Sequence, residues 1–193
     1  MTELTQNTTA TQAGPATGLT VWTVDKAHST VEFAVKHMMV STVKGTFREF
    51  EGTAHIDEEH PERSSVRATV DIASIDTKEP QRDAHLKSDD FFNAERFPKM
   101  TFVSKRVERV DEDTYNVIGD LTIRDITREV VLKTTFEGRV TDPWGNDRAG
   151  FEVTAEISRK EFGLRWNQLL ETGGAVVGDK VRIILHIELV KTQ

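Results

Sequence analysis

Apolar and polar residues alternate along most of the chain from residue 19 onward, and this period of two limits the folds that the chain can adopt. The alternation is regular in segments 29–38, 65–72, 128–137, 149–157 and 179–190. A period of two gives a strand one face for a core and another for water. In the segment 29–38, for example, Val31, Phe33, Val35 and His37 share one face. The sequence therefore predicts an all-β fold.

Turn-forming stretches separate the alternating runs and set the number of strands. DEEHPERS at 57–64, VDEDTYN at 110–116, RDIT at 124–127 and TDPWGND at 141–147 are typical of turns. We expect eight or nine strands, at 19–24, 29–38, 42–57, 65–75, 100–108, 114–123, 128–139, 148–158 and 179–190. Most links are short, which favours antiparallel neighbours. Within 42–57 the alternation slips near Arg48 and Glu49, which predicts a β-bulge.

So many antiparallel strands form either a sandwich or a closed barrel, and both hide most strand edges. Long runs, a bulge and inward glycines favour the barrel. The inward faces carry small residues: Gly45, Gly52, Ala54, Ala68, Gly119, Ala149 and Ala155. A barrel of about eight strands either fills with side chains or holds one slender ligand. Small apolar linings favour an apolar ligand, although bulky neighbours could instead fill the space.

Composition narrows the classes of function. Lys plus Arg number 25 and Asp plus Glu number 32, so the net charge of −7 argues against a nucleic-acid partner. The chain has no cysteine, which excludes disulfides and thiolate chemistry. Residues 1–18 are polar and small, so we expect a disordered N-terminal tail before one domain at 19–193. No basic start with an apolar run and no run of ~20 apolar residues appears, so we expect a cytoplasmic protein without an integral membrane segment.

Two segments lack the alternation. Residues 79–88 contain good helix formers after a proline, and this pattern predicts a short helix. In the adjoining stretch RDAHLKSDDFFNAERFP, at 82–98, Arg82 and Asp83 could tie the loop to the barrel while Leu86, Phe91 and Phe92 plug or line one end. The catalytic alternative has Asp83 orient His85 as a base, which needs a non-helical turn. We favour the structural interpretation.

The second segment, 159–178, is long for a connection and is therefore of functional interest. Its apolar residues Phe162, Trp166, Leu169 and Leu170 could cap the barrel, act as a gate for a lipid tail, or both. His28, His37 and His85 lack the spacing of a metal site, and we expect no metal. His37, on an inward face, is better placed to meet a ligand head group.

Several motifs, in a fixed order, resemble one family. They are W-x-x-D-x-x-H-S at 22–29, F-x-V-K-H at 33–37, G-T-F at 45–47, R-D-x-H-L-K-S-x-D-F-F at 82–92, F-P-x-M-T-F at 97–102, G-D-L-T-I-R-D-I-T at 119–127, R-x-x-F-G at 159–163 and V-G-D at 177–179. Together they resemble the YceI-like family of lipid-binding proteins over roughly residues 19–190. The resemblance implies an extended, lipocalin-like antiparallel β-barrel of about eight strands, with one or two short helices closing the ends.

The resemblance also implies a function: binding a long-chain isoprenoid, of quinone or polyprenyl type, or a similar amphiphile for transport, storage or sequestration. The lipid would be the ligand, with no further cofactor and no catalysis, and the architecture allows a homodimer. An enzyme acting on such a lipid through His37, Asp83 and His85, and a filled barrel serving as an interaction module, are the alternatives. We expect these residues to contact the ligand: Phe33, Val35, His37, Val43, Phe47, Ile72, Leu86, Phe91, Phe92, Phe102, Leu121, Phe151, Phe162, Trp166 and Ile183.

Overall fold

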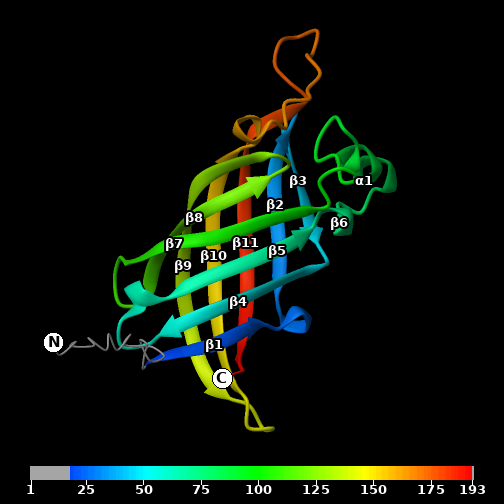
Figure 1. The fold of residues 1–193 in the computed structure, drawn as a ribbon. Helices are drawn as coiled ribbons and strands as arrows, with labels where there is room; N and C mark the ends of the chain where they lie inside the picture. The colour runs from blue at the N-terminus through cyan, green and yellow to red at the C-terminus, as the bar shows by residue number, and fades with distance from the viewer. Residues whose placement is uncertain (1–17, 193) are drawn as a thin grey trace, which may run out of the picture.

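The computed structural model describes residues 18–192, so the tail predicted for 1–18 lies outside the described residues except for Gly18. The described chain is almost entirely β-structure (Figure 1). Its single α-helix is α1 (Pro80–Lys87), and four short 3-10 turns cover Lys26–His28, Pro61–Arg63, Ile72–Ser74 and Arg159–Phe162. Pro80 occupies the first turn of α1, and the Glu79 carboxylate caps it by accepting hydrogen bonds from the backbone amides of Gln81 and Arg82.

Eight antiparallel strands close into a barrel, which confirms the predicted fold class. Around the barrel the order is β1 (Leu19–Val24), β4 (Phe50–Asp57), β5 (Ser65–Asp71), β7 (Lys99–Arg109), β8 (Thr114–Ile123), β9 (Ile126–Thr141), β10 (Asp147–Ser158) and β11 (Val177–Lys191). Pairing of β1 with β11 completes the ring. Three further strands, β2 (Thr30–His37), β3 (Ser41–Phe47) and β6 (Ile75–Asp76), continue the sheet from β11.

The single strand predicted for 42–57 is wrong: the chain breaks at Arg48 and Glu49 and forms two strands. The reason is pairing, because β3 lies between β2 and β6 whereas β4 lies between β1 and β5. The strand predicted for 65–75 also divides, with the 3-10 turn at 72–74 between β5 and β6. The two breaks face each other, since Arg48 N donates to Ser74 O (3.2 Å) and Asp71 N donates to Glu49 O (2.9 Å). The sheet therefore bends where these two breaks lie side by side.

Strand β11 has two partners along the same edge. Its first part pairs with β2 as far as His186, and its last part, from Leu189, pairs with β1. Glu188 lies at the change of partner, where its carbonyl accepts from Asp25 N (2.9 Å) and its amide donates to Ser29 Oγ (2.9 Å). Residues of the 22–29 motif thus bind β11 at the position where its pairing partner changes from β2 to β1.

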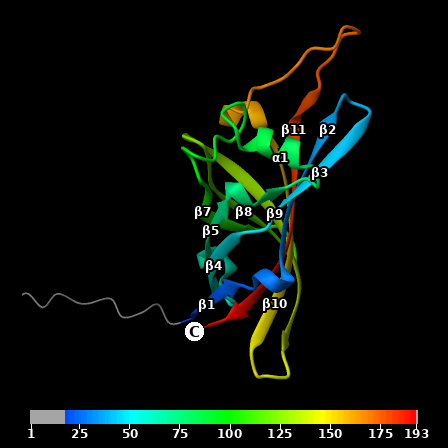
Figure 2. The same ribbon diagram turned by 90° about the vertical axis from the view of Figure 1, so that its right-hand side faces the viewer.

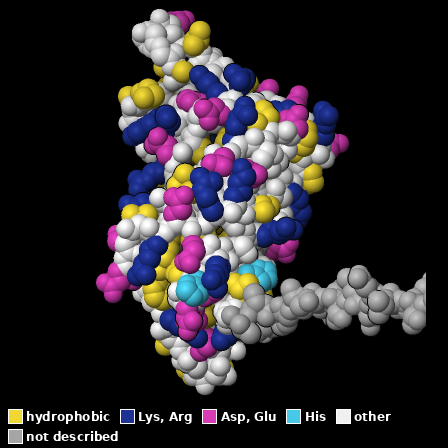
Figure 3. Space-filling model, turned by 60° about the vertical axis from the view of Figure 1, so that its left-hand side comes forward, with side chains coloured by type: hydrophobic (Ala, Val, Ile, Leu, Met, Phe, Trp, Pro, Cys, Tyr) yellow, Lys and Arg dark blue, Asp and Glu magenta, His cyan; other side chains and the backbone are white. Residues whose placement is uncertain are grey.

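Beyond the ring, β2 and β3 form a hairpin that extends past the barrel at the same end as the loop before β11 (Figure 2). Helix α1 and the loop after it lie against this end. No helix among the described residues is long and apolar enough to cross a bilayer. On the face drawn in Figure 3, basic and acidic side chains alternate over the barrel surface.

Candidate functional site

An apolar cavity of about 480 Å³ lies inside the barrel. Inward side chains of all eight barrel strands and of β2 and β3 line it. Gly52, Ala54, Ala68 and Ala149 contribute almost no bulk to this lining. Its volume falls within the range of about 300–1,000 Å³ that is typical of small-molecule sites. The barrel interior is therefore not completely filled by its own side chains.

Other inward small residues accommodate aromatic rings instead of empty space. A Cβ atom on Gly45 would overlap the Phe33 ring, and one on Gly119 would overlap the Val103 carbonyl and the Phe102 ring. The sequence left both uses of small residues open, and the structure contains both. Gly45 and Gly119 leave room for the rings of Phe33 and Phe102, and both of these residues line the cavity.

Of the fifteen residues expected to contact a ligand, six line this cavity: Phe33, Phe47, Phe102, Leu121, Phe151 and Ile183. Six others belong to the packed clusters at the α1 end of the barrel: Ile72, Leu86, Phe91, Phe92, Phe162 and Trp166. The remaining three lie on the β2–β3 hairpin: Val35, His37 and Val43. Val35 pairs with Val43, and His37 pairs with Ser41 at the last rung before the turn. The structure therefore separates the predicted set into a lining, an end cap and a hairpin.

The end cap joins the two segments that lacked alternation. Trp166, from the long connection, packs edge-on against His85 with ring centres 4.7 Å apart and lies 5.4 Å from the Phe91 ring. Phe92 meets Phe47 of the barrel wall in an edge-to-face contact at 6.1 Å. Phe91 and Phe162 are almost fully buried. Aromatic rings of α1, its following loop and the 159–166 segment thus close one end of the barrel.

The catalytic constellation considered for Asp83 and His85 is not assembled. Asp83 Oδ1 accepts hydrogen bonds from Thr77 N (2.9 Å) and Thr77 Oγ1 (2.5 Å), whereas His85 Nε2 lies 2.8 Å from Asp90 Oδ2. His37 lies apart from both, on the β2–β3 hairpin. Asp83 therefore does not orient His85, and each of the two belongs to a local structural contact.

The ties of the loop also differ in detail from the prediction. Arg82 donates to Thr77 Oγ1 (2.8 Å) and Thr77 O (2.7 Å), so Arg82 and Asp83 both fasten the loop to the residue just after β6. The loop after α1 is joined to the barrel by Arg124 of the β8–β9 turn. Arg124 donates a hydrogen bond to Phe91 O (3.0 Å) and forms an ion pair with Asp89 (3.1 Å). Sequence reasoning missed Arg124. Its position in the R-D-I-T motif was the available signal.

Arg159 is the second residue that sequence reasoning left without a role. Its side chain is buried, and its guanidinium donates to four backbone carbonyls: Leu164 O (2.7 Å), Trp166 O (2.8 Å), Gly178 O (2.8 Å) and Val177 O (3.2 Å). Burial lowers its pKa from the ordinary value. The motif R-x-x-F-G therefore supplies one cation that organises both ends of the long connection.

The charged side chains at the polar end of the cavity are those of Asp57, Glu58 and Arg139, whereas Glu32 and Glu51 border the cavity but alternate toward the outer face of their strands. The first three lie together with Ser64 and Ser65 at the β4–β5 turn. Arg139 is already paired there, with Glu58 at 2.5 Å and Asp147 at 2.9 Å, and its guanidinium lies over the Trp22 ring at 5.2 Å. The polar part of the lining therefore has a net negative charge, and its cation, Arg139, is already in ion pairs.

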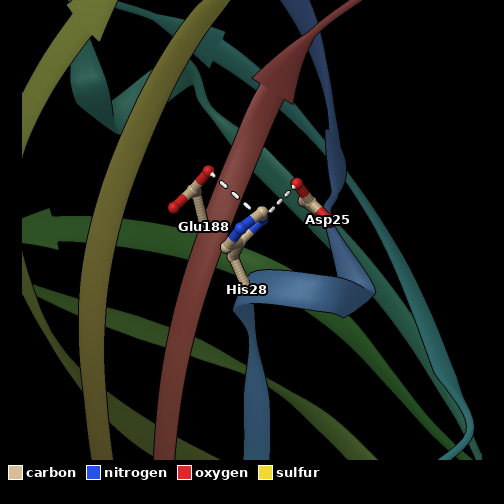
Figure 4. Close-up of side chains that lie close together, drawn as sticks. All are labelled: Asp25, His28 and Glu188. Carbon is tan, nitrogen blue, oxygen red and sulfur yellow. Dashed lines mark hydrogen bonds and ion pairs between the residues drawn. The ribbon is translucent and has the colours of Figure 1, made fainter. Parts of the chain in front are cut away.

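A cluster of Asp25, His28 and Glu188 lies outside the cavity, around the change of partner on β11 (Figure 4). His28 Nδ1 is 2.9 Å from Asp25 Oδ2 and 4.0 Å from Glu188 Oε1. Arg148 already supplies a cation to both carboxylates, at 2.8 Å and 2.5 Å. The hydrogen bond from His28, then that from Arg148, lowers the pKa of Asp25 to about 2, and Asp25 in turn raises the pKa of His28. The cluster is an ion-pair network that fastens the β1–β2 connection.

A closed antiparallel barrel around one apolar cavity places the protein in the class of lipocalin-like β-barrels. Within that class the chain belongs to the YceI-like family, because the family model described as YceI-like domain matches residues 22–189. A UPF0312 protein of Staphylococcus aureus is 42% identical over 165 residues, covering 85% of this chain and 94% of that protein. Another from Photorhabdus laumondii is 40% identical over 138 residues, covering 72% of this chain and 71% of that protein.

Solved structures of the same fold agree. BcnA of Burkholderia cenocepacia superposes with a TM-score of 0.76 at 27% identity, covering 86% of this chain and 98% of that one. The Campylobacter jejuni YCEI protein gives a TM-score of 0.70 at 26% identity, covering both chains completely. A polyisoprenoid binding domain of Saccharophagus degradans gives 0.67 at 13% identity, covering 89% and 98%, and shows the fold alone. The predicted homodimer and the cytoplasmic location stay predictions.

Proposed function

We propose that the protein binds a long-chain isoprenoid or a similar amphiphile, with its apolar tail inside the barrel, for transport, storage or sequestration. The single observation that carries the proposal is the apolar cavity of about 480 Å³ inside a closed barrel. Apolar surface that no side chain covers favours an apolar ligand, since burying it removes both from water. The Saccharophagus domain with this fold is described as polyisoprenoid binding, and membership of the YceI-like family points the same way.

The arrangement of polar groups supports one orientation of such a ligand. The α1 end is closed by packed aromatic rings, while serines and charged residues gather at the β4–β5 turn. A polar head group buried among Phe47, Phe92 and their neighbours would lose its hydrogen bonds to water. We therefore place the head group at the β4–β5 turn and the tail toward Phe47.

Charge narrows the class of head group. Asp57 and Glu58 are the carboxylates at this end of the cavity, and Arg139 is paired with Glu58 and Asp147, so a diphosphate would meet like charges without a free cation. A quinone or an alcohol carries no such penalty. We propose an uncharged head group, which favours quinones and prenols over prenyl diphosphates. Binding, not catalysis, is the proposed role, because Asp83 and His85 are committed to other partners.

The experiment compares geranylgeraniol with geranylgeranyl diphosphate, whose tails are identical, by isothermal titration calorimetry. We expect the alcohol to bind about tenfold more tightly at low salt, with a smaller difference near 1 M salt, where the Debye length is ~3 Å. Failure of both ligands to bind would refute the isoprenoid proposal. Equal or tighter binding of the diphosphate would refute only the uncharged head group.

A cavity-filling variant locates the site. Ala68 lines the cavity from β5, so Ala68→Phe is expected to reduce the affinity for geranylgeraniol at least about tenfold by occupying the space of the tail. Its neighbour Arg67 is exposed, and Arg67→Phe is the matched control, which should bind as the unmodified protein does. Solvent extraction of protein from its native host, followed by mass spectrometry, would then identify the natural ligand.

A further inference from the structure

Four apolar side chains project from one end of the molecule without covering any core. Met39, Val40 and Leu169 are 68%, 81% and 82% exposed, and Met38 is 39% exposed. Met38, Met39 and Val40 form the β2–β3 turn, and Leu169 belongs to the loop before β11. Met38 N donates to Val176 O (2.8 Å), so the two segments are joined. We call Met38, Met39, Val40 and Leu169 the apolar tip, and Figure 2 shows both of its segments reaching past the barrel.

The backbone of the turn does not explain why methionines occupy it. Met38 and Met39 have φ of 48° and 61°, and Val40 N donates to His37 O (3.2 Å), which is a turn with two left-handed central residues. Glycine and asparagine adopt that conformation at lower cost than methionine. Neither methionine fills the barrel. Neither the turn geometry nor the core therefore accounts for these methionine side chains.

Basic residues lie beside the apolar tip. The outer face of β2, β3 and β11 forms a groove whose charged residues are Lys36, Lys44, Lys78, Lys180 and Arg182 against Glu32, Asp76 and Glu156. Asp76 is already paired with Arg48, and Glu156 lies 3.6 Å from Lys180. The groove is thus net positive although the whole chain carries −7. Lys36 and Lys44, both exposed, flank the turn on its own two strands.

The opposite end of the molecule gives a useful contrast. Trp144 and Val140, in and beside the β9–β10 turn, are 81% and 63% exposed. The charged groups around that turn are paired, since Asp142 and Asp147 hold Arg148 and Arg139 at 2.7 Å and 2.9 Å. Exposed apolar residues thus occur at both ends, and of these two ends the apolar tip is the one that lies beside a net positive groove.

We propose that the apolar tip inserts into the surface of a bilayer containing anionic lipids, with Lys36 and Lys44 at the level of the head groups. Apolar side chains that enter the interface, with lysines that attract anionic lipids, are the two contributions that hold peripheral proteins at membranes. The inference does not depend on the ligand in the cavity. It adds a docking surface next to the end that α1 and Trp166 close.

The test is sedimentation with vesicles of phosphatidylcholine alone and of phosphatidylcholine mixed with phosphatidylglycerol. We expect the protein to bind the mixed vesicles and to bind neutral ones about tenfold more weakly. The double variant Met38→Asn with Met39→Gly should lower binding to mixed vesicles about tenfold. It should fold at least as stably, because its turn residues suit positive φ. The double variant Lys36→Gln with Lys44→Gln should lose the preference for anionic vesicles.

The matched control is Trp144→Ser with Val140→Ser, at the opposite end, which should bind vesicles as the unmodified protein does. The proposal is overturned if the unmodified protein does not sediment with mixed vesicles. Unchanged binding by the Met38→Asn and Met39→Gly variant at full stability would equally overturn it. So would loss of binding in the Trp144 and Val140 control, because the contact would then lie at the β9–β10 turn.

Discussion

At the scale of single residues, the same kind of residue serves two purposes inside this barrel. Ala68 leaves space that belongs to the cavity, whereas Gly52 leaves space that Val24 occupies and Gly119 leaves space that the Phe102 ring and the Val103 carbonyl occupy. A methyl group is therefore tolerable at some inward positions and not at others. What decides is the neighbour across the strand pair, not the small residue itself.

Gly119→Ala should lower the free energy of unfolding by about 1–3 kcal/mol, because its Cβ would overlap backbone as well as the Phe102 ring. Urea unfolding followed by circular dichroism measures the change. Gly150→Ala is the control, since a Cβ there meets nothing closer than Glu137 Cβ at 3.8 Å, and we expect a change within about 0.5 kcal/mol. Equal effects of the two substitutions would contradict this account of Gly119.

At the scale of elements, the long connection at 159–176 is held mainly through one buried side chain. Arg159 binds carbonyls on both sides of the connection, at Leu164 and Trp166 before it turns and at Val177 and Gly178 after it returns. This places Trp166 against His85 and Phe91, so that α1 and the connection form one end cap. The cap is thus an assembly of two segments distant in sequence.

Arg159→Met should destabilise the protein by about 3 kcal/mol, because four carbonyls lose a charged donor in a buried place. Hydrogen exchange at the amides of 164–178 should accelerate more than exchange in β8 and β9. Lys160→Met is the control, because Lys160 is exposed and its side chain makes no hydrogen bond among the described residues. Uniform acceleration across the barrel would argue against a local role in the cap.

At the scale of the whole molecule, the barrel closes where the pairing partner of β11 changes from β2 to β1. An ion-pair network surrounds that point and consists of Asp25, His28, Glu188 and Arg148. Arg148 also binds Asp142 of the β9–β10 turn, so the network joins three parts of the chain. Asp142 has its pKa lowered by Arg148, and Arg148 has its own raised. Closure is thus coupled to the protonation of His28, whose side chain is the exposed member of this network.

The stabilisation contributed by His28 should therefore depend on pH. Contact with Asp25 raises the pKa of His28 above its ordinary 6.5, so the folded state binds the proton more tightly than the unfolded state. The difference in unfolding free energy between the unmodified protein and His28→Ala should have its largest value below pH 6.5. It should shrink as the pH rises through the folded pKa. Chemical denaturation between pH 5 and 9 measures it, with exposed His55→Ala as the control. A pH-independent difference would contradict the ion-pair role.

The sequence by itself determined most of the strand segments, which face of each strand is inward, and a short helix within 79–88, because a period of two and helix formers after a proline are local signals. It could not determine which strand pairs with which. The break at Arg48 and Glu49, the two partners of β11 and the tie from Arg124 all depend on contacts between residues far apart in the chain. Six predicted ligand residues line the cavity and nine lie elsewhere, since alternation fixes the face of a side chain and not its depth along the barrel. Only the tertiary structure decided where small residues leave space and where a ring fills it.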